Sequence, residues 1–421
     1  MAPPAAGAHK PVHVAIVGGG PGGLALAQGL RKLGVDFAVF ERDRARTDYV
    51  QGFRLGIRER GINALRKCLP DDLFEAFLAT AGSAPKTALA LDEKLEPVEG
   101  LEGWGRSSED DLLSDRSVSR ITLRQILLSG LDNRVHLGTA FSHYTANADG
   151  AITAHLEDGS RIDCNILVGA DGANSRVRRQ LLPDAVTFDT GVRRIAGKMT
   201  LAAAAHHAIP PLLTDNTVSI LPRAGTDQLA RSLFITAHRV NPDAYKRFGL
   251  IGADDPALAG FHFNNTTSYV WWNTAYWQDE LASDAELAEA TPSDLLDLLL
   301  DRLGGWHPDL VKLVNHTDPS TVALLKVRSS RPVDPWPTGK VTLLGDAIHS
   351  MTYFRALGGN TALYDAGLLV DEFAAVAAGR KSEPEALAAY EAAMLPHGFE
   401  AVRTSLTNME RALGPPAQAA A

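Results

Sequence analysis

Hydrophobic positions near the start of the chain change from a strand-like to a helix-like period and back. Residues 12–17 read VHVAIV, a β-branched run typical of a buried strand, and residues 18–23 read GGGPGG. The segment LALAQGLRKLG that follows has the apolar spacing of a helix. VDFAVFER then predicts a second strand that closes on Glu41. The pattern therefore predicts a strand, a tight glycine turn, a helix and a second strand, the start of an α/β fold.

The glycines of this turn have separate predicted roles. Gly18 permits the turn, Gly20 lets the backbone approach a pyrophosphate, and Gly23 lets the helix pack close to the strand. Free amides at the helix start favour phosphate groups. Glu41 follows Gly23 by 18 residues, near the spacing at which a carboxylate accepts hydrogen bonds from an adenosine ribose. We predict a dinucleotide site here, and the alternative is a glycine-rich turn without a ligand.

Two later segments each place an aspartate at the predicted end of a strand. Residues 165–178 read NILVGADGANSRVR and contain Asp171, while residues 340–360 read KVTLLGDAIHSMTYFRALGGN and contain Asp346. Ligands of open α/β sheets bind at the carboxyl ends of the strands, so both positions fit a cofactor site. Either aspartate alone could instead cap a helix.

The pattern changes to a period of two between Leu182 and about Ser330, in stretches such as TVSILP, ARSLFITAHRV and TSYVWWNTAYW. These stretches predict an antiparallel sheet, and the later segments SDLLDLLLDRLGGW and EALAAYEAAML predict amphipathic helices. The predicted domains are a discontinuous cofactor domain (11–70, 116–182 and 331–413), a substrate domain (71–115 and 183–330), and flexible termini (1–10 and 414–421).

Composition narrows the functional classes. The 421 residues are 45% hydrophobic and 22% charged, which indicates a globular chain too long for one core. A net charge of −9 makes nucleic acid an unexpected partner. Two cysteines, Cys68 and Cys164, and thirteen histidines without HExxH spacing predict neither disulfides nor a metal site. So few cysteines indicate a reducing compartment, and we expect a cytoplasmic monomer or homodimer. No apolar run is long enough for a membrane span, so we expect no membrane partner.

The three glycine and aspartate motifs together resemble those of the single-component, group A FAD-dependent aromatic hydroxylases, typified by para-hydroxybenzoate hydroxylase. SRITLRQILLSGL from Ser119 is a looser fourth match. The resemblance extends from Val12 to about Leu413. It implies a Rossmann-like FAD-binding domain of the GR2 type, an inserted antiparallel β-sheet substrate domain and C-terminal helices.

The resemblance also implies an activity. Such monooxygenases use NAD(P)H as a transient co-substrate and O2, and they hydroxylate or epoxidise a small molecule through a flavin C4a-hydroperoxide. The expected substrate is apolar and electron-rich, either aromatic or polycyclic. Two alternatives are a cyclase or isomerase whose FAD is structural and a flavin-binding regulatory protein without turnover.

Roles follow from the resemblance at matching positions. Glu41 would bind the ribose, Arg120 and Asp346 the pyrophosphate and ribityl chain, and Asp171 would order the cofactor region, with the arginines after it contacting the nicotinamide nucleotide. Arg42 and Arg54 match less well, because an arginine in a loop is commonly only solvated. The expected cofactor contacts are Gly18, Gly20, Gly22, Gly23, Glu41, Arg42, Arg54, Arg120, Asp171, Asp346, Gly358, Gly359 and Asn360.

A reduced flavin is an anion, so positive potential is expected beside its ring. Backbone amides from Leu357 to Asn360 could supply it, or Gly358 and Gly359 could only bend the chain. The family's MTPF reads Met351-Thr352-Tyr353-Phe354 here. Tyr353 replaces a proline and is a candidate substrate contact, proton relay or packed ring.

The substrate candidates come from the predicted sheet. Phe261, Trp271 and Trp272 could line an apolar pocket or merely pack a sheet face. His238 and His262 are candidate bases for a phenolic proton, since imidazole titrates near neutrality. His349, within the GDAIH motif, is expected to be structural.

Overall fold

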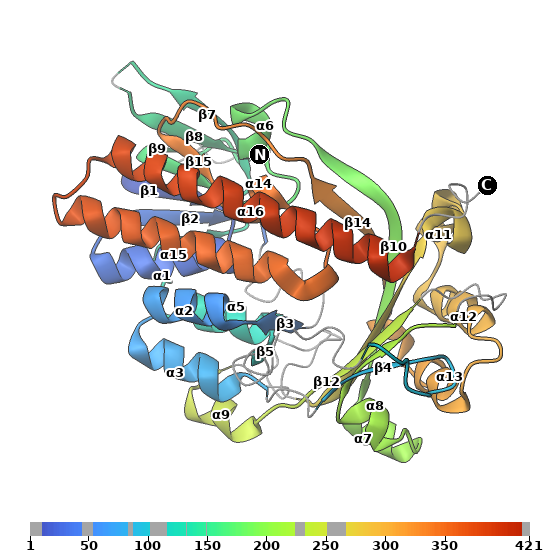
Figure 1. Cartoon of the computed structure of the whole chain (residues 1–421). Coiled ribbons are helices and arrows are strands. Elements are labelled where there is room, and N and C mark those ends of the chain that lie inside the picture. The colour runs from blue at the N-terminus through green and yellow to red at the C-terminus, as the bar shows by residue number, and fades with distance from the viewer. Residues whose placement is uncertain are drawn as a thin grey trace, which may run out of the picture. The chain divides into compact units, whose positions relative to one another are not determined.

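The chain is represented by a computed structural model that describes residues 11–43, 54–82, 87–101, 116–131, 133–148, 150–223, 232–250 and 267–414. It divides into two compact units (Figure 1). Unit 1 comprises Met1–Ala79, Val118–Phe188 and Ser329–Leu406, and unit 2 comprises Thr80–Ser117, Asp189–Arg328 and Thr407–Ala421. Compared with the predicted domains, residues 71–79, 183–188, 329 and 330 lie in unit 1, and residues 116, 117 and 407–413 lie in unit 2. The functions assigned to the predicted domains stay predictions.

Unit 1 is built on a mixed sheet whose main strands are parallel. The order is β6-β2-β1-β9-β8-β7, with β15 pairing with β9. The strands are β1 (Val12–Val17), β2 (Phe37–Glu41), β6 (Val135–Leu137), β7 (Phe141–Ala146), β8 (Ile152–Leu156), β9 (Arg161–Gly169) and β15 (Val341–Leu343). Val17 is in register with Phe40 and Gly169, and Gly169 with Leu343. The carboxyl ends of four parallel strands therefore meet at one edge.

Helices cover this sheet, and α1, α15 and α16 lie side by side (Figure 1). Pro21 starts α1, and Gly34 ends it with a φ of 71°. A Cβ on Gly29 would lie 2.2 Å from Val370, so α1 and α15 pack closely there. The helices that lie wholly or mainly in unit 1 are α1 (Pro21–Leu33), α2 (Glu59–Cys68), α3 (Asp71–Thr80), α5 (Arg120–Leu128), α6 (Arg176–Leu181), α14 (Asp346–His349), η3 (Phe354–Ala356), α15 (Leu357–Ala377) and α16 (Glu383–Leu413). Two short strands are β3 (Arg54–Ile57) and β5 (Arg116–Ser119).

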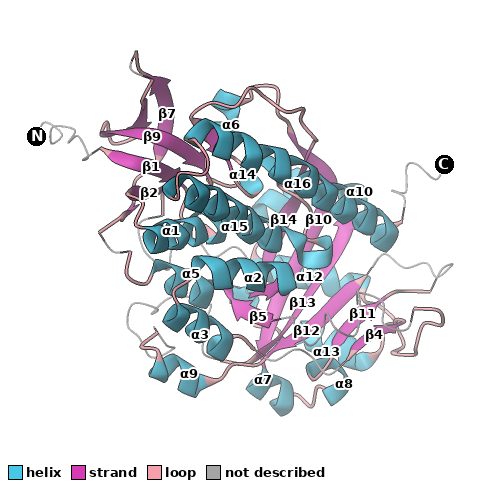
Figure 2. Ribbon diagram, turned by 60° about the vertical axis from the view of Figure 1, so that its left-hand side comes forward, coloured by secondary structure: helices cyan, strands magenta, loops and turns pink. Residues whose placement is uncertain are grey.

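Unit 2 contains a six-stranded sheet in the order β14-β10-β13-β12-β11-β4 (Figure 2). The β10–β13, β13–β12 and β12–β11 pairs are antiparallel and β11–β4 is parallel. The strands are β4 (Ala88–Leu91), β10 (Thr187–Thr200), β11 (Thr217–Ile220), β12 (Leu233–His238), β13 (Tyr269–Trp277) and β14 (Ala323–Ser330). The helices are α7 (Leu201–His206), α8 (Pro211–Thr214), α9 (Pro242–Arg247), α10 (Gln278–Leu281), α11 (Asp284–Glu289), α12 (Pro292–Arg302), α13 (Pro308–Asn315) and η2 (Pro319–Thr321). The predicted α/β fold class with an inserted sheet is confirmed.

The two faces of the unit 2 sheet differ. Alternate residues such as Ile195, Val270 and Trp272 pack in a core with leucines of α12 and α13. The register places Lys198 beside Trp271 and Thr236 opposite it, with side chains on the other face. We call this second face, carrying Arg194, Lys198, Phe234, Thr236, Trp271 and Asn273, the aromatic face.

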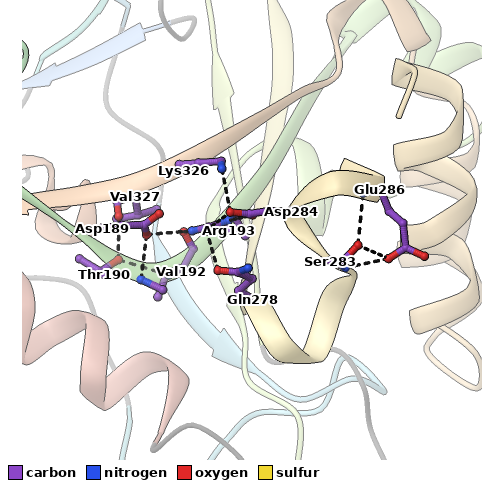
Figure 3. Close-up of polar contacts among 11 residues, drawn as sticks. Asp189, Thr190, Val192, Arg193, Gln278, Ser283, Asp284, Glu286, Lys326 and Val327 are labelled. Atoms are coloured by element: carbon purple, nitrogen blue, oxygen red, sulfur yellow. Dashed lines mark hydrogen bonds and ion pairs between the residues drawn. The ribbon is translucent and has the colours of Figure 1, made fainter. Parts of the chain in front are cut away.

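Arg193 is the centre of an ion-pair network within unit 2 (Figure 3). Its guanidinium is 1% exposed and donates to both carboxylate oxygens of Asp284, at 2.9 and 3.1 Å, and to Asp189 at 2.9 Å. It also donates to Gln278, while Lys326 donates to Asp284 at 2.8 Å. Strands β10 and β14 and helices α10 and α11 are thereby joined.

This network predicts a loss of stability in acid. Hydrogen bonds from Arg193 and Lys326 lower the pKa of Asp284 to about 2. A carboxyl whose folded pKa lies below its unfolded value of 3.8 contributes stability that is present above that value and is lost as pH falls towards about 2. Urea unfolding at stepped pH should show this decline in the wild type. The decline should be weaker in Asp284→Asn; an equal acid slope in both proteins would refute the assignment.

No helix in the described part of the chain is long and apolar enough to cross a membrane.

Candidate functional site

Three glycines of the first turn are required by the packing of the protein itself. Gly18 has a φ of +111°, and a Cβ there would lie 2.3 Å from the carbonyl oxygen of Ala170. A Cβ on Gly22 would lie 2.5 Å from Leu344, and one on Gly23 2.2 Å from the carbonyl oxygen of Gly18. These close approaches bring the start of α1 against the ends of its neighbouring strands.

Gly20 is different. Its φ is −76°, which any residue adopts, and nothing in the described part of the chain would lie within 4 Å of a Cβ there. Neither backbone strain nor packing within the protein therefore explains a glycine directly before α1. A ligand that approaches the turn does explain it, which fits a pyrophosphate at the helix start.

Glu41 lies at the end of β2 beside this turn. One carboxylate oxygen accepts a hydrogen bond from the amide of Gly19 at 2.5 Å, and the other accepts one from the amide of Asp43 at 2.9 Å. Burial, and then the charge of Glu41, raises the pKa of Asp43, which pairs with Arg124 at 3.0 Å. The Glu41 carboxylate is thus held in one orientation, with lone pairs left for ribose hydroxyls.

Asp171 follows β9 and does cap a helix. One oxygen accepts hydrogen bonds from the amide of Arg176 at 2.7 Å and from that of Val177 at 3.4 Å. Its other oxygen is buried and has no partner within the described residues. Arg178 is 5% exposed and donates to the carbonyl oxygens of Ala347 and Ala173, so the structure gives it a packing role.

Asp346 begins α14 at the end of β15. Its side chain is accessible to water, but the surrounding protein is dense enough that burial raises its pKa, while the charges of His349 and Arg120 oppose this. A Cβ on Gly358 would lie 3.8 Å from its carboxylate oxygen. Asp346, Arg120 and Gly358 are therefore neighbours, although 120 and 346 are far apart in sequence.

A buried ion pair supports the loop before Asp346. His349 Nε2 lies 2.6 Å from Asp365 Oδ2, and both side chains are 0% exposed. The same oxygen accepts a hydrogen bond from the amide of Gly345 at 2.9 Å. Burial alone would lower the pKa of His349, but Asp365 raises it above its ordinary value. Asp365 was missed by the sequence analysis; an acidic residue within the apolar helix TALYDAGLLV is the signal that could have found it.

The start of α15 is fixed by Asn360. Its side-chain oxygen accepts from the amide of Arg58 at 2.8 Å, and its amide donates to the carbonyl oxygens of Gly56 and Ala356. The side chain is thus used within unit 1, which leaves only the backbone amide for a cofactor. A Cβ on Gly359 would lie 3.3 Å from Leu55.

Three further candidate residues of unit 1, namely Tyr353, Arg42 and Arg54, have side chains that are partly or fully exposed to solvent. The ring of Tyr353 stacks on Phe354 with centroids 4.5 Å apart. Arg42 is exposed and Arg54 is partly exposed. The roles of Tyr353, Arg42 and Arg54 in cofactor or substrate binding stay predictions.

Two substrate candidates of unit 2, Trp271 and Trp272, lie on opposite faces of its sheet. Trp272 is fully buried in the core between the sheet and the helices, and its indole NH donates a hydrogen bond to Thr317 at 2.8 Å. The structure therefore gives Trp272 a packing role in place of the predicted one in a pocket wall. Trp271 lies on the aromatic face. His238 is 1% exposed, and its Nδ1 lies 2.8 Å from Ser117. Phe261 and His262 lie outside the described residues.

Together, the glycine turn, Glu41 and the strand-end aspartates define a dinucleotide-binding fold of the Rossmann type. The sequence matches the FAD binding domain family over residues 11–206 and 307–405. The chain therefore belongs to this family, and it resembles the single-component FAD-dependent aromatic hydroxylases.

Individual proteins similar to this chain are also described as FAD-dependent or FAD-containing. A protein of Photorhabdus luminescens described as an FAD containing monooxygenase is 30% identical, with a TM-score of 0.80 over 96% of this chain and 98% of that one. A dual O-methyltransferase/FAD-dependent monooxygenase of Phaeosphaeria nodorum is 30% identical over 89% of this chain but 42% of the relative. An FAD-dependent monooxygenase of Trichoderma harzianum is 26% identical over 84% of this chain and 81% of the relative. The chain thus spans less than half of the first curated relatives.

Proposed function

We propose that the protein is an FAD-dependent monooxygenase that uses NAD(P)H and O2 to hydroxylate or epoxidise an apolar, electron-rich small molecule. The family match and the three monooxygenase relatives support the reaction class. The observation that carries the proposal is the open space in front of Gly20 at the start of α1, beside a Glu41 carboxylate oriented by two amides.

The residues of unit 1 fit FAD in chemical type. The turn at Gly18–Gly23 and the start of α1 would bind the pyrophosphate, and Glu41 the ribose. Arg120 would balance phosphate charge, and Asp346 would accept hydrogen bonds from ribityl hydroxyls. The free Asp171 oxygen is a further acceptor.

The first-turn amides of α15, from Leu357 to Asn360, would stabilise negative charge on the ring of the reduced cofactor. When bound, FAD would supply the redox chemistry that the resemblance implies, namely the uptake of electrons from NAD(P)H and the activation of O2. The chain contributes binding, orientation and charge.

The test separates this proposal from its main alternative. The FAD-loaded protein is mixed anaerobically with NADPH or NADH and a panel of phenols, and flavin bleaching is followed; air is then admitted with ¹⁸O2. We expect at least one phenol to accelerate bleaching and to gain one ¹⁸O atom by mass spectrometry. A rearranged product with oxidised, unbleached flavin would support the cyclase or isomerase, which the Tyr353 replacement motivates. No reduction with any phenol or nucleotide would overturn the proposal.

A further inference from the structure

A buried polar cluster joins the three helices α14, α15 and α16 of unit 1. His349 of α14, Asp365 of α15 and Tyr390 of α16 are all buried, and the Tyr390 hydroxyl donates to the carbonyl oxygen of Leu343 at 2.8 Å. A Cβ on Gly398 of α16 would lie 2.3 Å from the His349 ring, so α16 packs directly against that ring. The imidazole is therefore held between α15 and α16.

One oxygen of Asp365 controls the backbone at Gly345. Gly345 has a φ of 63° and a ψ of −139°, a region that L side chains rarely adopt. A glycine moves between such conformations at little cost, so contacts must select one of them. Asp365 Oδ2 accepts a hydrogen bond from the Gly345 amide at 2.9 Å. The Gly345 carbonyl oxygen accepts from the amides of Ile348 and His349, each at 3.0 Å. Both sides of Gly345 are thereby fixed, and with them the direction of the next residue, Asp346.

The same oxygen also holds a charge close to Asp346. His349 Nε2 lies 2.6 Å from Asp365 Oδ2. Burial lowers the pKa of His349, but Asp365 and then Asp346 raise it above its ordinary value of 6.5. Burial raises the pKa of Asp346, and the charge of His349 opposes this rise. His349 therefore favours an ionised Asp346, and an ionised carboxylate accepts stronger hydrogen bonds than a neutral one.

We propose that Asp365 is a positioning residue of the cofactor site, which acts through Gly345 and His349 to present the Asp346 carboxylate to the hydroxyl groups of the ribityl chain. This rests on the proposed function, because it takes FAD as the ligand of unit 1. The contacts of Asp365 described above are to protein groups, so its effect on the cofactor passes through Asp346. It should appear with a ligand that reaches Asp346 and be absent with one that does not.

The experiment compares FAD with ADP, which has the adenosine and pyrophosphate groups but lacks the ribityl chain and the flavin ring. Both are titrated by calorimetry into the full-length protein freed of flavin. Asp365→Asn keeps the shape of the side chain and removes its charge. We expect this variant to bind FAD about tenfold more weakly and ADP as tightly as the wild type does, since a hydrogen bond to a charged group contributes about that factor or more.

A double variant tests whether Asp365 acts through Asp346. Asp346→Ala alone removes the acceptor and should weaken FAD binding about tenfold. In that background, Asp365→Asn should weaken it by less than about twofold more, because two changes that remove the same interaction are not additive. A double variant that binds FAD about a hundredfold more weakly than the wild type would overturn the inference.

Tyr390→Phe is the matched control for lost stability in the same cluster. It removes the hydrogen bond to Leu343 and leaves the contacts of Asp365 in place. Urea unfolding should show a loss of stability, while the affinities for FAD and ADP stay at their wild-type values. Asp365→Asn protein that binds FAD as tightly as the wild type, or that loses affinity equally for both ligands, would refute a positioning role.

The pH dependence of binding separates positioning from packing. Because the folded pKa of His349 is raised, its ion pair with Asp365 is intact below 6.5 and is lost as pH rises through the higher folded value. Asp346, Tyr390 and His397 are the other titratable groups around the pair. FAD affinity relative to ADP affinity should therefore fall with rising pH in the wild type and not in Asp365→Asn.

The same pH profile in both proteins would contradict the inference. His349→Gln removes the partner charge and should give the same selective loss of FAD affinity, which keeps the test available if Asp365→Asn does not fold. These titrations require no turnover. A selective loss of FAD affinity in a protein that NAD(P)H does not reduce would refute only the proposed function.

Discussion

A Gly20→Val variant is expected to fold and to bind FAD more weakly than the wild type does. The valine side chain meets no protein atom at its Cβ but occupies the space that we assign to the pyrophosphate. Overpacking of about 1–3 kcal/mol against the ligand would weaken FAD binding on the order of tenfold to a hundredfold. Thermal melts of the apoprotein and FAD titration followed by flavin fluorescence measure the two effects separately.

Gly23→Val is the matched control. Its Cβ would lie 2.2 Å from the Gly18 carbonyl oxygen, so this variant should lose stability whether or not FAD is present. A Gly20→Val protein that binds FAD as tightly as the wild type would show that the turn does not contact the cofactor. Equal losses of apoprotein stability in both variants would instead show that Gly20 is needed for packing.

Asp365→Ala should be strongly destabilising. It leaves His349 without its partner and removes the acceptor of the Gly345 amide. Loss of one member of a buried ion pair costs about 3–5 kcal/mol. Equilibrium urea unfolding of the wild type and the variant measures the difference, and Asp365→Asn, which keeps the shape and one acceptor, should cost less.

Asp371→Ala, also in α15, is a control for the effect on helix propensity of replacing an aspartate with alanine. Asp371 pairs with Lys67, and its side chain is 54% exposed, so this change should cost less than about 1 kcal/mol. Similar unfolding free energies for the two alanine variants would contradict a buried pair that supports the Gly345–Asp346 loop.

The fold of unit 1 was predictable because each of its motifs lies within a short segment of the sequence. The glycine turn forces β1 to end at Val17, and β2 ends at Glu41 as the sequence predicts. The strands before Asp171 and Asp346 likewise end within three residues of these aspartates, at Gly169 and Leu343. The motifs do not indicate which distant segments form hydrogen bonds with each other. The hydrogen bonds between the Asn360 side chain and the backbone of Gly56 and Arg58 are an example.

The substrate side was less predictable, and one error was avoidable. Trp271 and Trp272 are consecutive residues of a strand, so their side chains must point to opposite faces, and at most one can line a given pocket. The register assigns Trp271 to the aromatic face. The Arg193 network could not be predicted, since its members come from segments far apart in the sequence: Arg193 and Asp284 are 91 residues apart, and Asp284 and Lys326 are 42 residues apart.

The close packing of Gly22 has a consequence for the order of events during synthesis. Its neighbours, Leu344 and Ala362, lie more than 300 residues further along the chain. At about 5–20 residues per second, a ribosome takes roughly a quarter of a minute to a minute to make that stretch. The glycine turn therefore emerges first but reaches its final packing only after β15 and α15 have been made. FAD capture should consequently be a late event, and a nascent chain stalled before Leu344 should not retain the flavin.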